Sequence, residues 1–177
     1  INCRIKSLNL NMLPIFSVKQ AICQEKSEKR RYYVNMGAKK IYTLGTDRRN
    51  EEDFIEILLA YNIQSLIDVR RFPKSKIPIF TRENLDPLLN RAGIEYHFLG
   101  VELGGFRKGG YIAYTLTDDF KRGITMLESI AFNKNAVIIC AERFPWKCHR
   151  RWIARELRKR GWEVEHIIDK GKVWVPK

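Results

Sequence analysis

Short apolar runs alternate with longer amphipathic segments from residue 41 to the end of the chain. Runs rich in Ile, Leu and Val predict buried strands at residues 41–45, 65–69, 94–99, 136–140 and 163–168, with a further edge strand at 172–175. Between them, helical spacing of apolar residues predicts helices that begin at Asn50, Thr81, Thr117 and Cys148, with Asn50 and Thr81 acting as N-caps. This alternation predicts a three-layer, Rossmann-like α/β domain with a mostly parallel sheet of about five strands.

Residues 1–40 lack this period, and they hold nine Lys and Arg against two Glu. The break in pattern predicts a basic N-terminal extension at 1–40, followed by a single α/β domain at 41–177. Two interpretations of the extension stay open. It is either an upstream segment with no role of its own or a basic arm that contacts nucleic acid.

Composition narrows the class of protein. Of the 177 residues, 30% are charged and 45% hydrophobic, and no apolar run approaches the roughly 18 residues that cross a bilayer. We therefore expect a soluble protein with no membrane partner. Four cysteines in a basic domain with its own core favour the cytosol over a disulfide-stapled secreted fold. The net charge of +13 favours an anionic partner, either a small molecule or nucleic acid.

The loops that follow the predicted strands hold the candidate chemistry, because ligands of parallel sheets bind beyond the carboxyl ends of the strands. Asp68 and Arg70 lie two apart at the end of one strand, where they can pair with each other or jointly bind a ligand. The loop after the third strand contains Gly104, Gly105 and Arg107, a composition suited to a mobile cover or to close approach of backbone to an anion.

The fourth loop is the richest, because an apolar strand ends on Cys140 and a basic helix follows within eleven residues. The N–H groups and dipole of a helix N-terminus attract anions and lower the pKa of a nearby thiol. Cys140 is therefore the leading candidate nucleophile, although a packed apolar thiol is the alternative. Proton transfer is assigned to Glu142, Asp68 or His149. Anion binding is assigned to Arg70, Arg143, Arg150 and Arg151, together with Arg107, Gly104 and Gly105.

Four motifs in order give the chain a resemblance to the domain-of-unknown-function 488 family, across about residues 41–168. They are Tyr42 to Gly45, Leu66 to Arg70 with Phe72-Pro73, Leu99 to Gly105, and Cys140-Ala141-Glu142 leading through Pro145 to Cys148-His149-Arg150. The family has no settled activity, so the resemblance implies a fold and site positions. It names no reaction and no cofactor.

Four alternatives are weighed beside this resemblance. Rhodanese-like sulfurtransferases share a Leu-Ile-Asp-Val-Arg strand and a later cysteine, but Pro145 removes a backbone donor from the loop that would hold the anion. A phosphatase of the Cys-x5-Arg kind is excluded by Trp146 and Ala154. No metal site is assigned, since Cys148 and His149 are expected to point apart on a helix. A redox pair of Cys140 and Cys148 stays an alternative.

The fourth predicted helix suggests a non-catalytic alternative. Seven cations lie along residues 147–160, opposed mainly by Glu156. Such a surface can follow a phosphate backbone, with Trp146, Trp152 and Tyr111 as candidates for stacking on bases. In that case the protein is a nucleic-acid-binding module with structural cysteines. A solvated helix face is the simpler interpretation. The sequence fixes neither a cofactor nor an oligomeric state.

Overall fold

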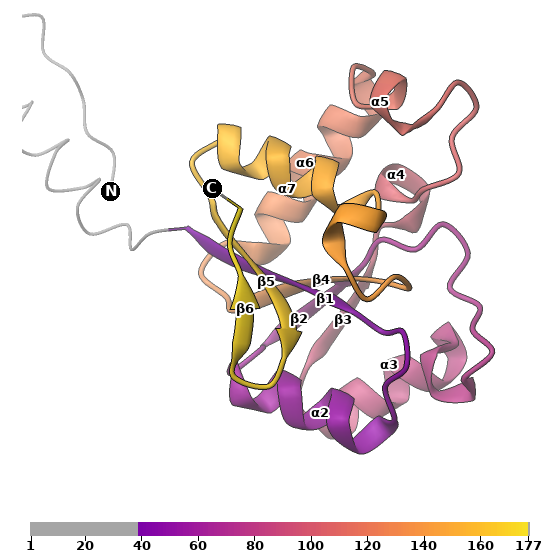
Figure 1. Cartoon of the computed structure of the whole chain (residues 1–177), viewed down its shortest axis with the longest axis vertical. Coiled ribbons are helices and arrows are strands. Elements are labelled where there is room, and N and C mark those ends of the chain that lie inside the picture. Colours follow the sequence, from indigo (N-terminus) through magenta and orange to yellow (C-terminus); the bar gives the residue numbers. More distant parts are fainter. Residues whose placement is uncertain (1–38, 177) are drawn as a thin grey trace, which may run out of the picture. The chain divides into compact units, whose positions relative to one another are not determined.

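A computed structural model describes residues 39–176 (Figure 1). Five parallel strands and one antiparallel edge strand form a sheet in the order β3-β2-β4-β1-β5-β6. The strands are β1 (Lys40–Gly45), β2 (Ser65–Asp68), β3 (Glu95–Phe98), β4 (Ala136–Cys140), β5 (Glu163–Asp169) and β6 (Lys172–Trp174). The predicted α/β class and mostly parallel sheet are confirmed. All but the last two residues of the predicted basic extension lie outside the described residues.

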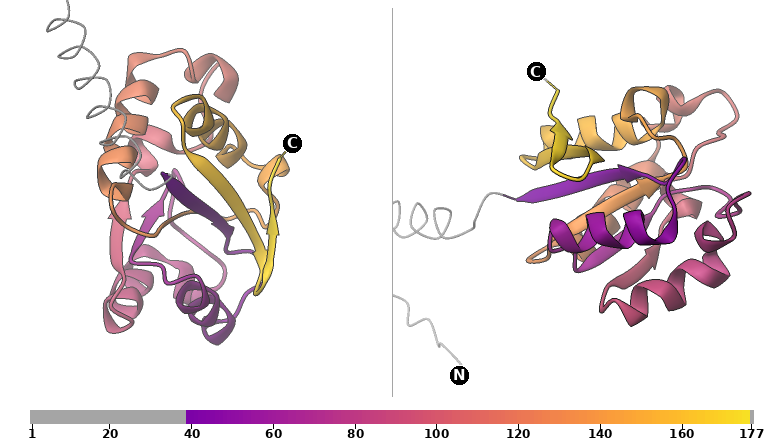
Figure 2. Two further views of the ribbon diagram at one scale, coloured as in Figure 1. Left: turned by 90° about the vertical axis from the view of Figure 1, so that its left-hand side faces the viewer. Right: turned by 60° about the horizontal axis from the view of Figure 1, so that its bottom comes forward.

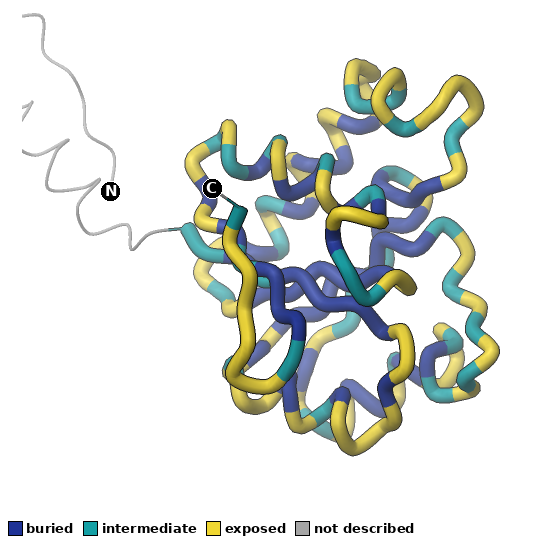
Figure 3. Tube along the Cα trace, viewed as in Figure 1, coloured by how far each residue is buried: buried dark blue, intermediate teal, exposed yellow. Residues whose placement is uncertain are grey.

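Helices cover both faces of the sheet (Figures 1 and 2). On one face, α2 (Glu51–Ala60) and α3 (Arg82–Arg91) pack through residues such as Phe54 and Leu85. On the other face, α6 (Asp118–Ala131) and α7 (Arg150–Lys159) pack through residues such as Ile124 and Ile153. Strand β4 is buried along its whole length, whereas edge strand β6 is exposed (Figure 3). Because side chains alternate along β4, Cys140 lies with the core cluster beneath α6 and α7.

Helices α2, α3 and α6 each begin directly after the residue predicted to start them, namely Asn50, Thr81 and Thr117. The Asn50 side chain accepts a hydrogen bond from the Asp53 N–H at 2.7 Å, and Thr117 accepts one from the Phe120 N–H at 3.3 Å. Thr81 precedes α3 as expected, but its hydroxyl donates to the Pro78 carbonyl at 2.9 Å and does not cap the helix. A short 3₁₀ turn, η1 (Pro78–Phe80), ends at this residue and supplies that carbonyl. Thr81 is therefore the N-cap residue by position, as predicted, but its side chain makes no capping hydrogen bond.

The segment after β3 is more ordered than the long loop that the glycines predicted. It contains two single-turn helices, α4 (Gly100–Leu103) and α5 (Tyr111–Tyr114). The Arg107 side chain donates to the carbonyls of Val101 at 2.6 Å and Gly104 at 2.9 Å, and the Tyr111 hydroxyl donates to Leu103 at 2.6 Å. These bonds satisfy carbonyls at the end of α4 and tie the segment to itself.

Helix α7 begins at Arg150, two residues later than predicted. A 3₁₀ turn, η2 (Pro145–Lys147), and an extended Cys148 precede it. This difference decides where the Cys148 side chain points, and the candidate site depends on it.

Candidate thiol site at the carboxyl ends of the strands

Backbone hydrogen bonds join the segments that follow β1 and β2 to the end of β4. The Thr46 N–H after β1 donates to the Cys140 carbonyl at 3.0 Å, and the Val69 N–H after β2 donates to the Ile139 carbonyl at 3.2 Å. Gly45 is required here, because a Cβ at this position would lie 2.3 Å from the Glu142 carbonyl oxygen. The loops after β1, β2 and β4 are thus packed against one another.

Two thiols and one imidazole meet at this point. The Cys140 sulfur lies 3.8 Å from His149 Nδ1, and the Cys148 sulfur lies 3.7 Å from the same nitrogen. Both cysteines are buried and neither forms a disulfide. Cys148 is extended and lies before the helix, and its sulfur approaches the imidazole of the next residue. The expectation that Cys148 and His149 point apart is therefore wrong, since it assumed that both are helical.

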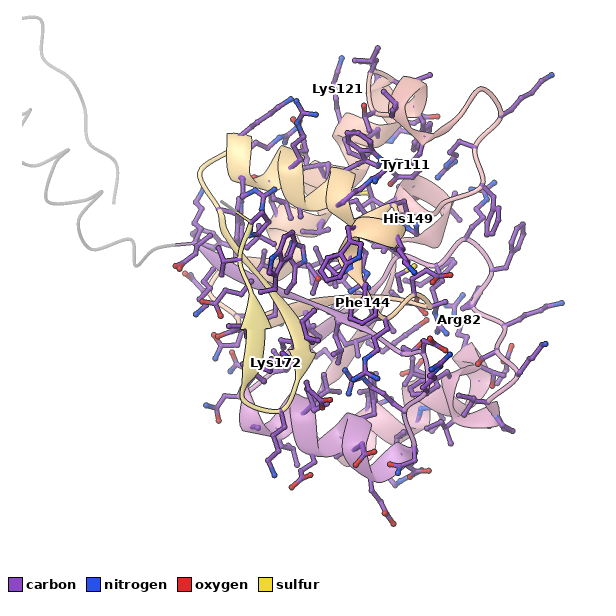
Figure 4. All side chains as sticks on the ribbon, in the orientation of Figure 1. Arg82, Tyr111, Lys121, Phe144, His149 and Lys172 are labelled. Atoms are coloured by element: carbon purple, nitrogen blue, oxygen red, sulfur yellow. The ribbon has the colours of Figure 1, made fainter. Side chains whose placement is uncertain are left out.

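A backbone carbonyl fixes which ring nitrogen of the neutral His149 carries the hydrogen. Nε2 lies 2.9 Å from the Val69 carbonyl oxygen, which can only accept a hydrogen bond, so Nε2 carries a hydrogen. In the neutral ring, Nδ1 is then the lone-pair nitrogen, and it faces both sulfurs. The Tyr111 ring packs against the imidazole with ring centroids 5.1 Å apart (Figure 4). His149 is thereby oriented as a proton acceptor for either thiol.

Arg150 brings a buried positive charge to the same place. Its side chain is 1% exposed, and it donates to the carbonyls of Glu142 and Arg143 and to the Thr43 hydroxyl. Among residues 39–176, no carboxylate forms a salt bridge with it, and its Nε has no hydrogen-bond partner. The Arg150 backbone N–H also points at the Cys148 sulfur, at 3.4 Å. A buried guanidinium without a carboxylate favours an anion nearby.

These surroundings separate the two thiols electrostatically. The pKa of Cys148 is held well below the usual value of a thiol by a hydrogen bond from Cys140, and further by His149 and the charge of Arg150, against the cost of burial. The pKa of Cys140 is raised by its hydrogen bond to Cys148 and by burial. A thiolate on Cys148 beside a neutral thiol on Cys140 is the arrangement that these groups favour.

Asp68 and Arg70 bond to each other in a buried ion pair. Arg70 Nη2 lies 2.6 Å and Nε 2.9 Å from the Asp68 carboxylate, which also accepts from the Tyr96 hydroxyl at 2.9 Å. Arg70 Nη1 donates to the Phe80 carbonyl at 2.6 Å. Of the two arrangements left open by the sequence, the structure has the internal pair. Val69, whose carbonyl orients His149, lies between the two partners.

The other predicted site residues lie around this centre, and no described side-chain hydrogen bond joins them to the sulfurs. Arg143 pairs with Asp169 at 3.1 Å, Arg151 donates to the Trp146 carbonyl at 3.0 Å, and the Glu142 side chain is exposed. Arg107 caps α4, and Gly104 packs against the backbone of Gly100 and Arg71. Gly105 is adjacent to His149, since a Cβ there would lie 3.0 Å from Nδ1.

The structure adds Cys148 to the predicted set. The sequence shows Cys148 directly before His149-Arg150, but whether its sulfur reaches the site depends on where helix α7 begins. Cys140, Cys148 and His149 each offer one donor atom, and these three atoms lie within 4.8 Å of one another. Two thiolates and an imidazole are ligands of soft or borderline metals.

The fold and the site define a class of protein. It is a mostly parallel α/β domain in which two buried cysteines, a half-buried histidine and a buried arginine gather at the carboxyl end of β4. Within that class, the family model described as "Domain of unknown function DUF488" matches residues 50–157, and the chain belongs to this family. The match spans α2 to α7 and includes the cysteines, His149 and Arg150. A search of curated proteins gives no match. Within the described part of the chain, no helix has the length and apolar character needed to cross a bilayer.

Proposed function

We propose that this protein is a small thiol-dependent enzyme that acts on an anionic substrate, either a phosphorylated compound, a nucleotide or a nucleic acid. The observation that carries the proposal is the buried Arg150, which has no salt bridge to a carboxylate within residues 39–176 and lies beside a Cys–His pair. A positive charge placed in this way stabilises a thiolate or an incoming anion.

The roles follow from the geometry. Cys148 is the nucleophile, in place of the Cys140 favoured by the sequence, because the N–H of Arg150 and the Nδ1 of His149 both face its sulfur. His149 takes the Cys148 proton on Nδ1. The thiolate bonds to an electrophilic atom of the substrate, and the leaving group departs with the bonding electrons and receives that proton. Cys140 stays a thiol that can attack the adduct. Free thiols in this role favour a reducing compartment such as the cytosol.

Trapping of a covalent adduct tests this proposal. The full chain is incubated with panels of phosphorylated nucleotides, oligonucleotides and sulfur donors, and the intact mass is measured under acid quench. We expect a mass increase that maps to Cys148, that is absent in Cys148→Ser and that accumulates in Cys140→Ser, where its resolution is slower. An adduct consisting of one added sulfur would identify a sulfurtransferase. An adduct that persists in Cys148→Ser, or none with any panel, would contradict the proposal.

A second candidate function, a nucleic-acid-binding module, is favoured by one surface. Phe144 and Trp146 stack at 4.9 Å, and Trp146 meets Trp174 of β6 edge to face at 5.2 Å. Arg151 bonds the Trp146 carbonyl and lies over the Trp152 ring at 4.7 Å. Exposed aromatic rings interleaved with cations are typical of surfaces that bind single strands by stacking on bases and neutralising phosphates.

Replacing Trp146 by alanine tests this candidate. Trp146 is 44% exposed, and stacking of one base on an aromatic side chain contributes about 1–3 kcal/mol. We expect the Kd for a fluorescent single-stranded oligonucleotide, measured by anisotropy, to rise about 5- to 150-fold. The control is Phe132→Ala, which removes an exposed aromatic (48%) at the end of α6. Equal losses in both variants, or no binding by the wild type, would remove the nucleic-acid interpretation.

A further inference from the structure

We infer that Cys140, Cys148 and His149 form a zinc-binding site with three protein ligands and one open position, and that zinc regulates the thiol chemistry by occupying it. The metal site stands on the positions of the donor atoms alone. The regulatory consequence rests on the proposed function.

The two sulfur-to-nitrogen distances match tetrahedral zinc. With Zn–S near 2.3 Å and Zn–N near 2.05 Å, a tetrahedral ion requires sulfur and nitrogen about 3.6 Å apart. The Cys140 and Cys148 sulfurs lie 3.8 and 3.7 Å from His149 Nδ1. All three donor atoms lie within 4.8 Å of one another, so an ion can enter if the two sulfurs approach each other by up to about 1 Å. The arrangement is pre-organised although the three residues come from two different elements, the end of β4 and the start of α7.

The surroundings of the three ligands are also those of a metal site. The Val69 carbonyl accepts from His149 Nε2 at 2.9 Å and so leaves Nδ1 as the ligand atom, which is how zinc-binding histidines are commonly oriented. The Arg150 backbone N–H donates to the Cys148 sulfur at 3.4 Å. Gly105 lies against the imidazole and carries no side chain. A Cβ at this position would lie 3.0 Å from Nδ1. The fourth position is thus not closed by a side chain of residue 105.

Zinc and the nucleophile exclude each other. Zinc binding releases the thiol proton of Cys140 and the proton held between Cys148 and His149. Each sulfur then donates a lone pair to the metal. The ion plus two thiolates is neutral, so the charge of Arg150 remains available to attract an anion as the fourth ligand. A zinc-loaded protein therefore has no thiolate free to attack a substrate.

Cobalt substitution tests the site without reference to activity. The full chain is stripped of metal under reducing conditions and titrated with Co²⁺, and then with Zn²⁺ in competition with a chromophoric chelator. We expect one Co²⁺ per chain, with sulfur-to-cobalt charge-transfer bands and the strong visible bands of a tetrahedral site. The bands are displaced by Zn²⁺. Cys140→Ser, Cys148→Ser and His149→Ala are each expected to weaken zinc binding by at least about 100-fold, more than loss of an outer-shell partner.

The matched control is the double variant Cys3→Ser/Cys23→Ser, which leaves the three ligands in place and is expected to keep the spectrum. If a serine variant does not fold, wild-type protein alkylated at Cys148 is titrated in its place, and it is expected to bind no cobalt. Absent bands in the wild type, bands that survive alkylation, or bands lost in the control would overturn the inference. A normal cobalt spectrum without any covalent adduct contradicts the proposed enzyme alone. An adduct at Cys148 without cobalt binding contradicts the zinc site alone.

Discussion

Asp68→Asn is expected to lower the free energy of unfolding by about 3–5 kcal/mol, which is the usual cost of removing one partner from a buried ion pair. Asp68 is fully buried and Arg70 is 4% exposed, so the variant leaves a guanidinium charge in the core with an amide in place of its carboxylate. Urea unfolding followed by circular dichroism measures the change, as a lower midpoint at an unchanged slope.

Asp118→Asn is the matched control, because it breaks an ion pair with Lys121 in which both side chains are more than half exposed. Exposed pairs contribute about 0–1 kcal/mol, so its unfolding curve is expected to stay close to the wild type. If Asp68→Asn lowers the free energy of unfolding by less than about 1 kcal/mol, other groups compensate the charge of Arg70. The ion pair would then not be what holds the segment around Val69 in place.

Arg150→Met is expected to raise the pKa of Cys148, so that the loss of alkylation on acidification begins at a higher pH than in the wild type. The substitution removes a buried charge that favours the thiolate, and at pH values below the pKa each unit of pKa changes the thiolate fraction tenfold. Arg150→Lys keeps a charge at the same position and is expected to retain more of the reactivity. The rate is read from the mass of the Cys148 peptide after timed exposure to iodoacetamide.

Arg151→Met controls for the general loss of one cation from α7. Arg151 is exposed and bonds the Trp146 carbonyl, without a described contact to either sulfur. Its alkylation rate is expected to stay within about twofold of the wild type, since exposed charges are screened by salt. Equal slowing in both arginine variants would show that net charge, and not the buried guanidinium, controls the thiol.

The regular elements could be predicted because their signals are local. The apolar run of β4 and the helical spacing of Phe54, Ile57 and Leu58 in α2 give the strand and the helix directly, and alternating elements of this length allow few topologies. The cap at Asn50 is also local, since its partner is three residues away. The same reasoning places Thr81 correctly before α3 but misses its side-chain partner, because a preceding 3₁₀ turn offers the hydroxyl a carbonyl.

The site depended on contacts that a single sequence does not display. From the sequence, Asp68 and Arg70 can either bind a ligand jointly or pair with each other. The Tyr96 hydroxyl and the Phe80 carbonyl, both from other segments, complete the internal pair. The Cys148 side chain points into the site only because α7 begins two residues later than its pattern suggests. Helix boundaries are the least certain part of such predictions, and here a shift of two residues brings a second sulfur to His149.

The pH dependence of Cys148 alkylation in the folded, metal-free protein tests the central claim most directly. Between about pH 8 and pH 6, an ordinary thiol with a pKa near 8.5 loses reactivity roughly 80-fold, because its thiolate becomes protonated. Cys148, whose pKa lies far lower, is expected to keep nearly constant reactivity over this range and to lose it only as the pH falls through that lower pKa. Cys140 stays slow throughout. A Cys148 that titrates like an ordinary thiol, or that resists alkylation until the protein unfolds, would contradict the account.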